Sequence, residues 1–270
     1  MTTRIITGVC LTLGLAVVLA VGGWLFSVLY MASICFSMYE VYRALRQTSH
    51  RSIQWPAWVC LALSVPLFEI SGSVSPLLPL IAGTSMLLGA MIMFRSEPKL
   101  EDILISCMPL FCVLLPGMCM LGIQDAPTRG QQLLLTILSF GIPLAGDTVA
   151  YFVGSRFGVR RLCPAVSPNK SLEGAAAGLL GSIVFSMAIF GIFAIFMDMP
   201  PFWHCLVLGL LGGVAGQLGD LFASLIKRHC GIKDYSSIFP GHGGMMDRLD
   251  SVYWATVVMY VYLHLMPFPA

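Results

Sequence analysis

Residues 239–250, FPGHGGMMDRLD, place one histidine, one arginine, two aspartates and three glycines within twelve positions. Gly243 and Gly244, after His242, let backbone amides approach an anion without a Cβ in the way. A helix that begins directly afterwards offers further free amides to a phosphate. Asp247 and Asp250 are three residues apart and share a helix face. Acids also cap helices, but a cap explains neither the neighbouring arginine nor the glycines, so the segment predicts an anion-binding turn beside carboxylates.

A second polar stripe lies in the apolar segment just upstream. It combines a carboxylate, a hydroxyl and two cations at i, i+4, i+7 and i+8, which is one helical face: Asp220, Ser224, Lys227 and Arg228. Ionisable residues inside apolar segments are functional candidates, and Asp147 is another. An internal ion pair of Asp220 with Ser224 or Lys227 is the structural alternative. Glu40 and Glu69 border apolar segments, and we expect them to reach the helix end or pair locally.

These residue types suit phosphate chemistry with magnesium. Carboxylates among lysines and arginines, without paired histidines or CxxC pairs, favour Mg²⁺ over zinc or copper. The nine cysteines are scattered, and we interpret them as packing residues. Positioning and charge neutralisation dominate phosphoryl and nucleotidyl transfer. The sequence has no GxxxxGK[ST] loop, so it gives no sign of a soluble nucleotide-binding module.

The rest of the chain must hold these residues at a membrane. Of 270 residues, 57% are hydrophobic and 10% are charged, and the mean hydropathy is +0.87. This leaves too little polar surface for a soluble domain. We predict an all-α polytopic membrane protein of about nine transmembrane helices, with the first one retained. The expected spans are residues 5–21, 23–42, 55–71, 76–94, 103–121, 132–153, 174–197, 203–226 and 250–266.

Basic residues set the predicted orientation. With a cytoplasmic N-terminus, fourteen of the fifteen lysines and arginines lie on the inside, and Arg129 lies outside. The polar segments then face the cytoplasm. No repeat or linker divides the chain, so we expect one domain over residues 1–270, with N-terminal spans in 1–130 and a catalytic half in 131–270. Two inside loops stand out: residues 154–173 are basic and rich in Gly, Pro and Ser, and residues 228–249 are a long connection without obvious secondary structure. Loops of this kind in a compact protein tend to be functional.

Residues 224–250, SLIKRHCGIKDYSSIFPGHGGMMDRLD, resemble the signature of the phosphatidate cytidylyltransferases, or CDP-diacylglycerol synthases. That signature runs S-x-x-K-R, then K-D, then P-x-H-G-G-x-x-D-R-x-D, and every fixed position is present. Residues 147–174 look like a second block of this family, D-[ST]-x-A-Y-x-x-G, then F-G, then S-P-x-K-[ST]-x-E-G. The resemblance covers roughly the C-terminal half of the chain.

The resemblance implies a helical homodimer in a bacterial-type cell membrane, with no nucleic acid as partner. It implies that CTP and phosphatidic acid become CDP-diacylglycerol and diphosphate, with dependence on Mg²⁺. It also implies a paired-metal centre, with Mg²⁺ and a monovalent cation such as K⁺, on the acids that match Asp220 and Asp247. The lipid phosphate is already an anionic nucleophile, so His242 is not required as a strong base.

Each candidate residue thereby receives a predicted role. The predicted metal ligands are Asp220, Asp247 and Asp250. The predicted catalytic residues are two of these acids and three phosphate-binding cations: Asp220, Asp247, Lys227, Arg228 and Arg248. The predicted substrate-binding residues are Asp147, Ser167, Lys170, Glu173, Ser224, His242, Gly243 and Gly244.

Two other functions stay open on the residues alone. Acids beside cations among many spans also suit an ion-coupled transporter, although the polar residues crowd at one rim and no internal repeat is present. A CTP-dependent lipid kinase could use similar acids and bases. It would transfer the γ-phosphate of CTP to an alcohol such as a polyprenol.

Overall fold

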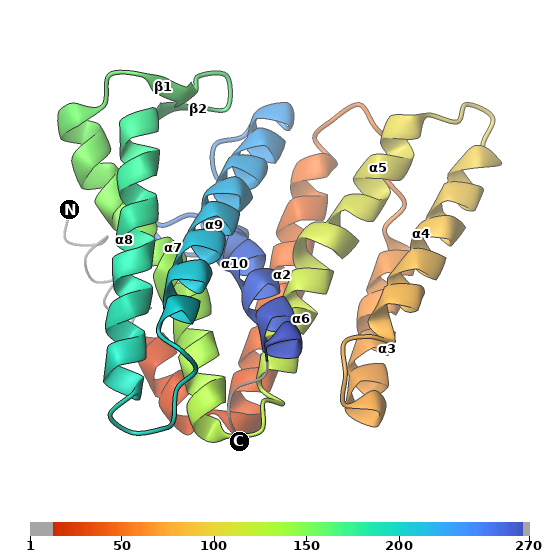
Figure 1. Ribbon diagram of the computed structural model, residues 1–270. Helices are drawn as coiled ribbons and strands as arrows, with labels where there is room; N and C mark the ends of the chain where they lie inside the picture. Colours follow the sequence, from red (N-terminus) through yellow and green to blue (C-terminus); the bar gives the residue numbers. More distant parts are fainter. Residues whose placement is uncertain (1–12, 267–270) are drawn as a thin grey trace. The chain divides into compact units, whose positions relative to one another are not determined.

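The computed structural model describes residues 13–266, and it is mainly helical in this range (Figure 1). Residues 13–21 are helical, and the part of the first expected span before them lies outside the described residues. The elements that follow are α2 (Gly23–Leu45), α3 (Trp55–Ser71), α4 (Leu77–Met93), α5 (Leu100–Pro109), the π-helix η1 (Leu110–Leu114), α6 (Leu115–Ile123), α7 (Arg129–Phe157), β1 (Arg161–Cys163), β2 (Ser167–Ser171), α8 (Leu172–Phe193), α9 (Trp203–His229) and α10 (Met246–Leu265). The predicted helical fold class is confirmed.

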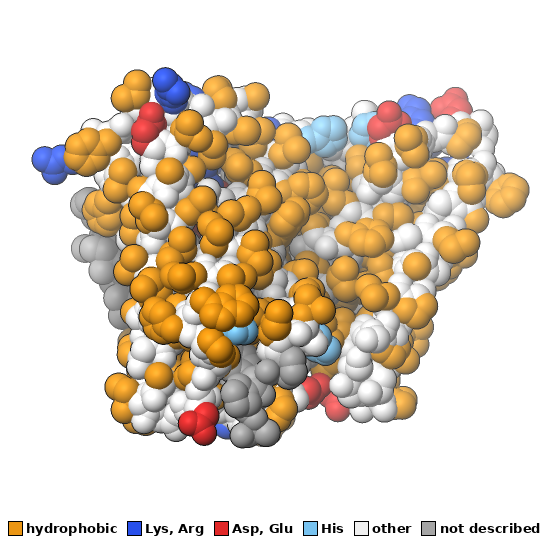
Figure 2. Space-filling view, viewed as in Figure 1, with side chains coloured by type: hydrophobic (Ala, Val, Ile, Leu, Met, Phe, Trp, Pro, Cys, Tyr) orange, Lys and Arg blue, Asp and Glu red, His pale blue; other side chains and the backbone are white. Residues whose placement is uncertain are grey.

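The helices have the composition of a membrane protein. Within residues 13–266, five helical segments are long and apolar enough to cross a membrane: Gly23–Leu45, Leu100–Ile123, Arg129–Phe157, Leu172–Phe193 and Trp203–His229. Helices α3 and α4 are apolar but have 17 residues each. Large apolar side chains stay exposed on α8, where Leu180 is 65% and Val184 64% accessible, and hydrophobic side chains cover much of the face shown in Figure 2. Lipid is the solvent that suits such surfaces. The nine spans and their orientation stay predictions.

The described chain divides into two compact units. The first contains the chain up to Gly122 together with His229–Asp247, and the second contains Ile123–Arg228 and the chain from Arg248 onward. The first unit thus carries α2 to α6 and the glycine-rich segment. The second carries α7, the β1–β2 hairpin, α8, α9 and most of α10. The expectation of a single domain stays a prediction.

In the first unit, α2 lies against the long segment Leu100–Ile123. The break before α2 falls at Gly22 and Gly23, where φ is 60° and 53°, a conformation that favours glycine. The Tyr42 hydroxyl donates to the Ser106 carbonyl at 2.8 Å. A Cβ at Gly117 would lie 2.6 Å from Ile34 Cγ1, so only glycine permits this approach.

In the second unit, glycines bring α7, α8 and α9 close together. A Cβ at Gly178 on α8 would lie 2.8 Å from the Gly146 carbonyl on α7. A Cβ at Gly213 on α9 would lie 2.8 Å from Ser182 Cβ on α8. Small residues allow close helix approach in lipid, where the hydrophobic effect adds little between helices. Figure 1 shows α7 and α8 side by side, with the hairpin at one end.

The connection expected over residues 154–173 contains more structure than the sequence predicted. Helix α7 continues to Phe157, and β1 and β2 form an antiparallel hairpin with Arg161 opposite Ser171. The Ser171 side chain then caps α8 by accepting the Gly174 N–H at 3.1 Å. The expectation of a loop over residues 154–173 is therefore wrong for the residues that form the end of α7 and the hairpin.

Candidate active site

A polar cavity of about 750 Å³ lies in the second unit. Its lining comes from α7, the β1–β2 hairpin, α8 and α9. Five of the predicted site residues line it: Asp147, Ser167, Lys170, Asp220 and Ser224. Apolar helices thus surround a space that is lined by carboxylates, a lysine and hydroxyls, which is an arrangement for polar ligands.

The central contact of this cavity joins the β1–β2 hairpin to α9. Lys170 on β2 forms an ion pair with Asp220 on α9. The sequence left open an internal ion pair of Asp220 with Ser224 or Lys227. The structure instead pairs Asp220 with Lys170. Asp147 on α7 lies within electrostatic range of Lys170, Asp220 and Arg248. The second unit thus brings together acids and bases from α7, β2, α9 and α10.

Asp250 extends this cluster from α10. Its side chain is buried, and its Oδ1 accepts hydrogen bonds from Ser251 N at 2.6 Å and Ser251 Oγ at 3.2 Å. It lies within electrostatic range of Asp220 and Lys227. Helix α9 comes close to α10 because Gly219 has no side chain: a Cβ there would lie 2.6 Å from the Asp250 carbonyl. The second unit therefore contains an interacting set of three predicted carboxylates and three predicted cations. They are Asp147, Asp220, Asp250, Lys170, Lys227 and Arg248.

Two further predicted residues hold the hairpin itself. The Glu173 carboxylate accepts the N–H groups of Val159 and Arg160 at 3.1–3.2 Å. Arg228 Nε donates to the Val166 carbonyl in the hairpin turn at 3.2 Å. Neither residue is among the described residues that line the cavity. Their observed contacts shape the strand that carries Lys170.

The glycine-rich segment lies in the first unit and is organised around Asp247. Asp247 Oδ2 accepts the N–H of Tyr235 at 2.8 Å and that of Gly244 at 2.9 Å. Gly243 has φ +80°, and a Cβ there would lie 2.8 Å from the same oxygen. Asp247 lies in the first turn of α10, as the capping interpretation expects, but this oxygen accepts N–H groups from the segment before the helix. Its role as a metal ligand stays a prediction.

Glu40 fixes this segment from α2, and sequence reasoning missed it. The side chain is fully buried. Its carboxylate accepts hydrogen bonds from Ser236 Oγ at 2.5 Å, Met245 N at 3.1 Å and Met246 N at 2.7 Å. The expectation that Glu40 reaches the helix end or pairs locally is wrong, because its partners lie about 200 positions later in the chain. A carboxylate bordering a span was the available signal, but the sequence does not name a distant partner.

His242 occupies the turn between these contacts. The backbone N–H of His242 donates to the Phe239 carbonyl at 2.8 Å, and the backbone N–H of Phe239 donates to the Gly243 carbonyl at 2.9 Å. Within residues 13–266, His242 Nδ1 is buried and has no hydrogen-bond partner. A buried polar atom of this kind calls for a ligand or a water, so the ring nitrogen is a candidate for phosphate contact.

Comparisons with known proteins decide the family. The model of the cytidylyltransferase family matches residues 2–266. The chain belongs to the cytidylyltransferase family. It is 29% identical to the phosphatidate cytidylyltransferase of Bacillus subtilis over 98% of both chains. It is 38% identical to the enzyme of the same name from Staphylococcus aureus over 136 residues, about half of each chain.

The carboxylates of this cytidylyltransferase have the donor chemistry that Mg²⁺ requires, since the ion prefers oxygen ligands and usually binds one or two carboxylates together with substrate phosphates. Asp220 already holds a cation, the Lys170 ammonium. In the described part of the chain, no three His, Cys, Asp or Glu side chains form a ready metal cluster. The residues therefore fit a metal ion whose remaining ligands are phosphate oxygens of the substrate.

Further polar residues of this cytidylyltransferase line the cavity without having been predicted as site residues, among them Arg161, Asn169 and Gln217. Gln217 lies three residues before Asp220 on α9, and its Nε2 donates to the Ala175 carbonyl at 2.9 Å. A polar residue on the same face as Asp220 was a usable signal. Arg161 lies among several basic residues, and only the position of the hairpin shows that it is the one that lines the cavity.

Proposed function

We propose that the protein transfers the cytidylyl group of CTP to phosphatidic acid, forming CDP-diacylglycerol and diphosphate for phospholipid synthesis. Membership of the cytidylyltransferase family and the likeness to phosphatidate cytidylyltransferases along the whole chain support this reaction. The single structural observation that carries it is the cluster of Asp147, Lys170 and Asp220 around one cavity. The cluster provides opposite charges around one cavity, as transfer between two anionic substrates requires.

In this reaction a phosphate oxygen of phosphatidic acid forms a bond to the α-phosphorus of CTP. The bond from that phosphorus to the oxygen bridging the β-phosphorus breaks, and diphosphate leaves with the electron pair. Lys170, Lys227 and Arg248 offset the charge of the two anions as they approach. The lipid phosphate needs no strong base, so His242 serves as a contact to phosphate.

The proposal includes Mg²⁺, with K⁺ as a second ion. Asp220 and Asp247 would hold the metal, and Asp250 would be a ligand or would support these ligands. When bound, the metal would neutralise phosphate charge and orient the diphosphate for departure. Lys170 would then exchange its contact with Asp220 for one with substrate phosphate.

The proposal also covers the arrangement in the membrane. Nine spans with an inside N-terminus place the basic segments and the cavity on the cytoplasmic side, as the distribution of lysine and arginine supports. CTP would reach the cavity from that side, and phosphatidic acid from the bilayer. We propose a homodimer as the working form.

Labelled CTP distinguishes this reaction from its rivals. Purified protein would be given phosphatidic acid with CTP that carries ³²P at either the α or the γ position. The proposal predicts label in lipid only from α-labelled CTP, together with release of diphosphate. Label in lipid only from γ-labelled CTP, with a lipid alcohol as acceptor, would indicate a kinase. Absence of label from lipid in both arms would refute group transfer and favour a carrier.

A further inference from the structure

A second polar pocket lies in the first unit, between α2 and α3. Its volume is about 450 Å³. The lining residues that matter here are Arg46, His50, Arg51, Gln54 and Trp55. None of them belongs to the candidate active site, and the pocket shares no lining residue with the cavity around Lys170.

The pocket is cationic by composition. Residues 43–55, RALRQTSHRSIQW, contain three arginines and one histidine and no acidic residue. Arg46 Nη2 donates to the neutral Gln54 side chain at 2.6 Å and so keeps its full charge. The Arg51 guanidinium is exposed, and it has no hydrogen-bond or ion-pair partner within residues 13–266. Two arginine charges are therefore offered to an incoming anion.

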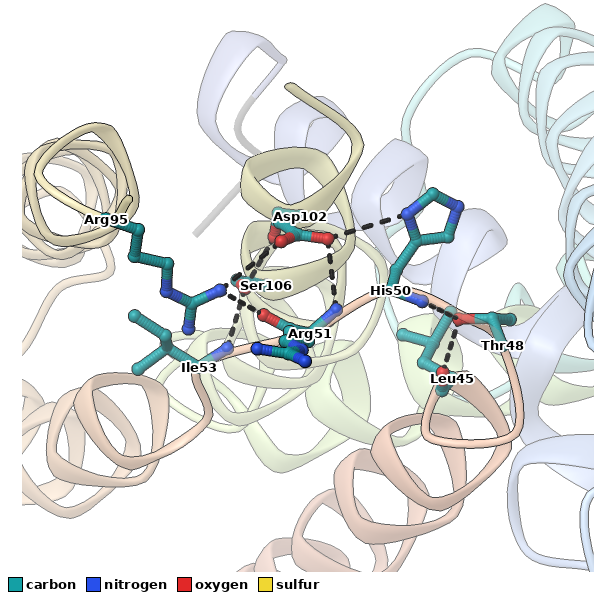
Figure 3. Close-up of polar contacts among 8 residues, drawn as sticks. All are labelled: Leu45, Thr48, His50, Arg51, Ile53, Arg95, Asp102 and Ser106. Atoms are coloured by element: carbon teal, nitrogen blue, oxygen red, sulfur yellow. Dashed lines mark hydrogen bonds and ion pairs between the residues drawn. The ribbon is translucent and has the colours of Figure 1, made fainter. Parts of the chain in front are cut away.

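A buried carboxylate, Asp102 on α5, holds the loop in place (Figure 3). Asp102 on α5 is 3% exposed, and its Oδ1 accepts the Arg51 N–H at 3.0 Å while Ser106 Oγ accepts the Ile53 N–H at 2.9 Å. Arg95 Nη1 contacts Asp102 Oδ2 at 3.3 Å and donates to the Arg51 carbonyl at 2.7 Å. His50 Nδ1 lies 3.5 Å from Asp102 Oδ1. These contacts offset the Asp102 charge and fix the backbone at Arg51 and Ile53.

The position of the pocket indicates the kind of anion. It begins directly after Leu45, the last residue of α2, which is long and apolar enough to cross a membrane. Trp55 begins α3 on the other side of the loop and is 56% exposed. Tryptophan and arginine at the end of a span are typical of the level of lipid headgroups. A phosphate there would meet the guanidinium groups of Arg46 and Arg51, and guanidinium groups can bind phosphate oxygens in a bidentate manner.

We propose that this pocket binds the phosphate of an anionic phospholipid headgroup, at a site distinct from the candidate active site. The lipid contributes a phosphate to Arg46 and Arg51, and Trp55 lies beside its headgroup. Inorganic phosphate offers the same chemistry without the acyl chains. The competition arm below separates these two sources.

The test compares lipid binding by the purified full chain and by variants. Native mass spectrometry in a neutral detergent would follow titration with phosphatidylglycerol, with phosphatidylcholine as the neutral lipid. Each of Arg46→Gln and Arg51→Gln should weaken the phosphatidylglycerol-specific site about fivefold, which is the effect of one cation near a lipid surface. Arg51→Lys keeps the charge and should retain more of the binding than Arg51→Gln. Lys99→Gln, an exposed cation outside the pocket, is the matched control and should bind like the wild type.

The outcomes separate clearly. Loss of phosphatidylglycerol binding in the two arginine variants, without displacement by excess inorganic phosphate, supports a lipid headgroup site. Displacement by inorganic phosphate supports the anion site but assigns it to free phosphate. Wild-type binding in both arginine variants, or an equal loss in Lys99→Gln, overturns the proposal. Unchanged melting temperatures in the absence of lipid would show that the variants are folded.

Discussion

The ammonium of Lys170, on a short β-strand, contacts the carboxylate of Asp220, fifty residues later on α9. This ion pair ties the hairpin to the helix that carries the polar stripe. Both side chains line the same cavity, and each is partly accessible, at 29% and 25%. A substrate phosphate that enters the cavity can therefore compete for Lys170 and leave Asp220 to another cation.

Lys170→Met should lower kcat/KM for CTP at least about 100-fold, as loss of one charge-stabilising group does in other enzymes. The reason is that the variant loses the cation that faces both Asp220 and the substrate phosphates. Formation of labelled CDP-diacylglycerol measures the effect. Lys170→Arg keeps the charge and should recover part of the activity. Lys99→Met is the matched control, and near-normal turnover of Lys170→Met would show that Lys170 does not touch the reaction.

Glu40→Ala should destabilise the protein by about 2–4 kcal/mol, because three donors to the buried carboxylate lose their acceptor. The melting temperature in detergent and the rate of CDP-diacylglycerol formation should both fall. Glu40→Gln keeps one acceptor oxygen and should have a smaller effect. Glu69→Gln changes an exposed carboxylate and should stay within about 0.5 kcal/mol of the wild type. Equal melting temperatures for Glu40→Ala and Glu69→Gln would contradict the assigned role of Glu40.

Gly244→Ala should disturb the glycine-rich segment, since the new Cβ would lie 2.6 Å from Glu40 Cδ. Lower activity and a lower melting temperature are expected. Gly89→Ala on α4, where no atom lies within 4 Å of the new Cβ, should be neutral or stabilising by up to about 1 kcal/mol. Gly244→Ala combined with Glu40→Ala should cost less than the sum of the single changes, because the overlap is removed. Strict additivity would show that the two residues are not coupled.

Glu173→Ala should raise KM for CTP about tenfold, through misplacement of the hairpin rather than loss of a substrate contact. The variant frees the N–H groups of Val159 and Arg160, which otherwise fix the start of the hairpin. Steady-state kinetics would separate KM from kcat, and the melting temperature should change little because the side chain is exposed. A fall in kcat at constant KM would indicate that Glu173 acts at the reacting groups.

The helices were predictable because bilayer-length apolar runs carry their own signal. The predicted span at 203–226 became Trp203–His229, since its charged end continues the same helix. The polar stripe on α9 was also readable from helical spacing. Asp147 and Asp220 could be nominated as ionisable groups in apolar segments, and Asp250 from its spacing with Asp247, before their interactions were visible.

The remaining features depend on contacts between distant parts of the chain. The hairpin is short, and Glu173 and Arg228 hold it from outside its own strands, while Asp220 on α9 pairs with Lys170 on β2. Glu40 bonds to residues about 200 positions away, which local sequence cannot indicate. One oxygen of Asp247 turned out to hold backbone amides, a role that the spacing of acids suggested only as an alternative.

Asp220→Asn tests the central claim most directly, because Asp220 joins the cavity, the ion pair and the proposed metal. The measurement is transfer of α-³²P from CTP to phosphatidic acid by purified wild-type and variant protein of equal melting temperature. We expect Asp220→Asn to lower transfer by about 1,000-fold. Ser139→Ala, a buried change on α7 outside the cavity, should stay close to the wild type in rate. Turnover of Asp220→Asn within a few fold of the wild type would contradict the central claim.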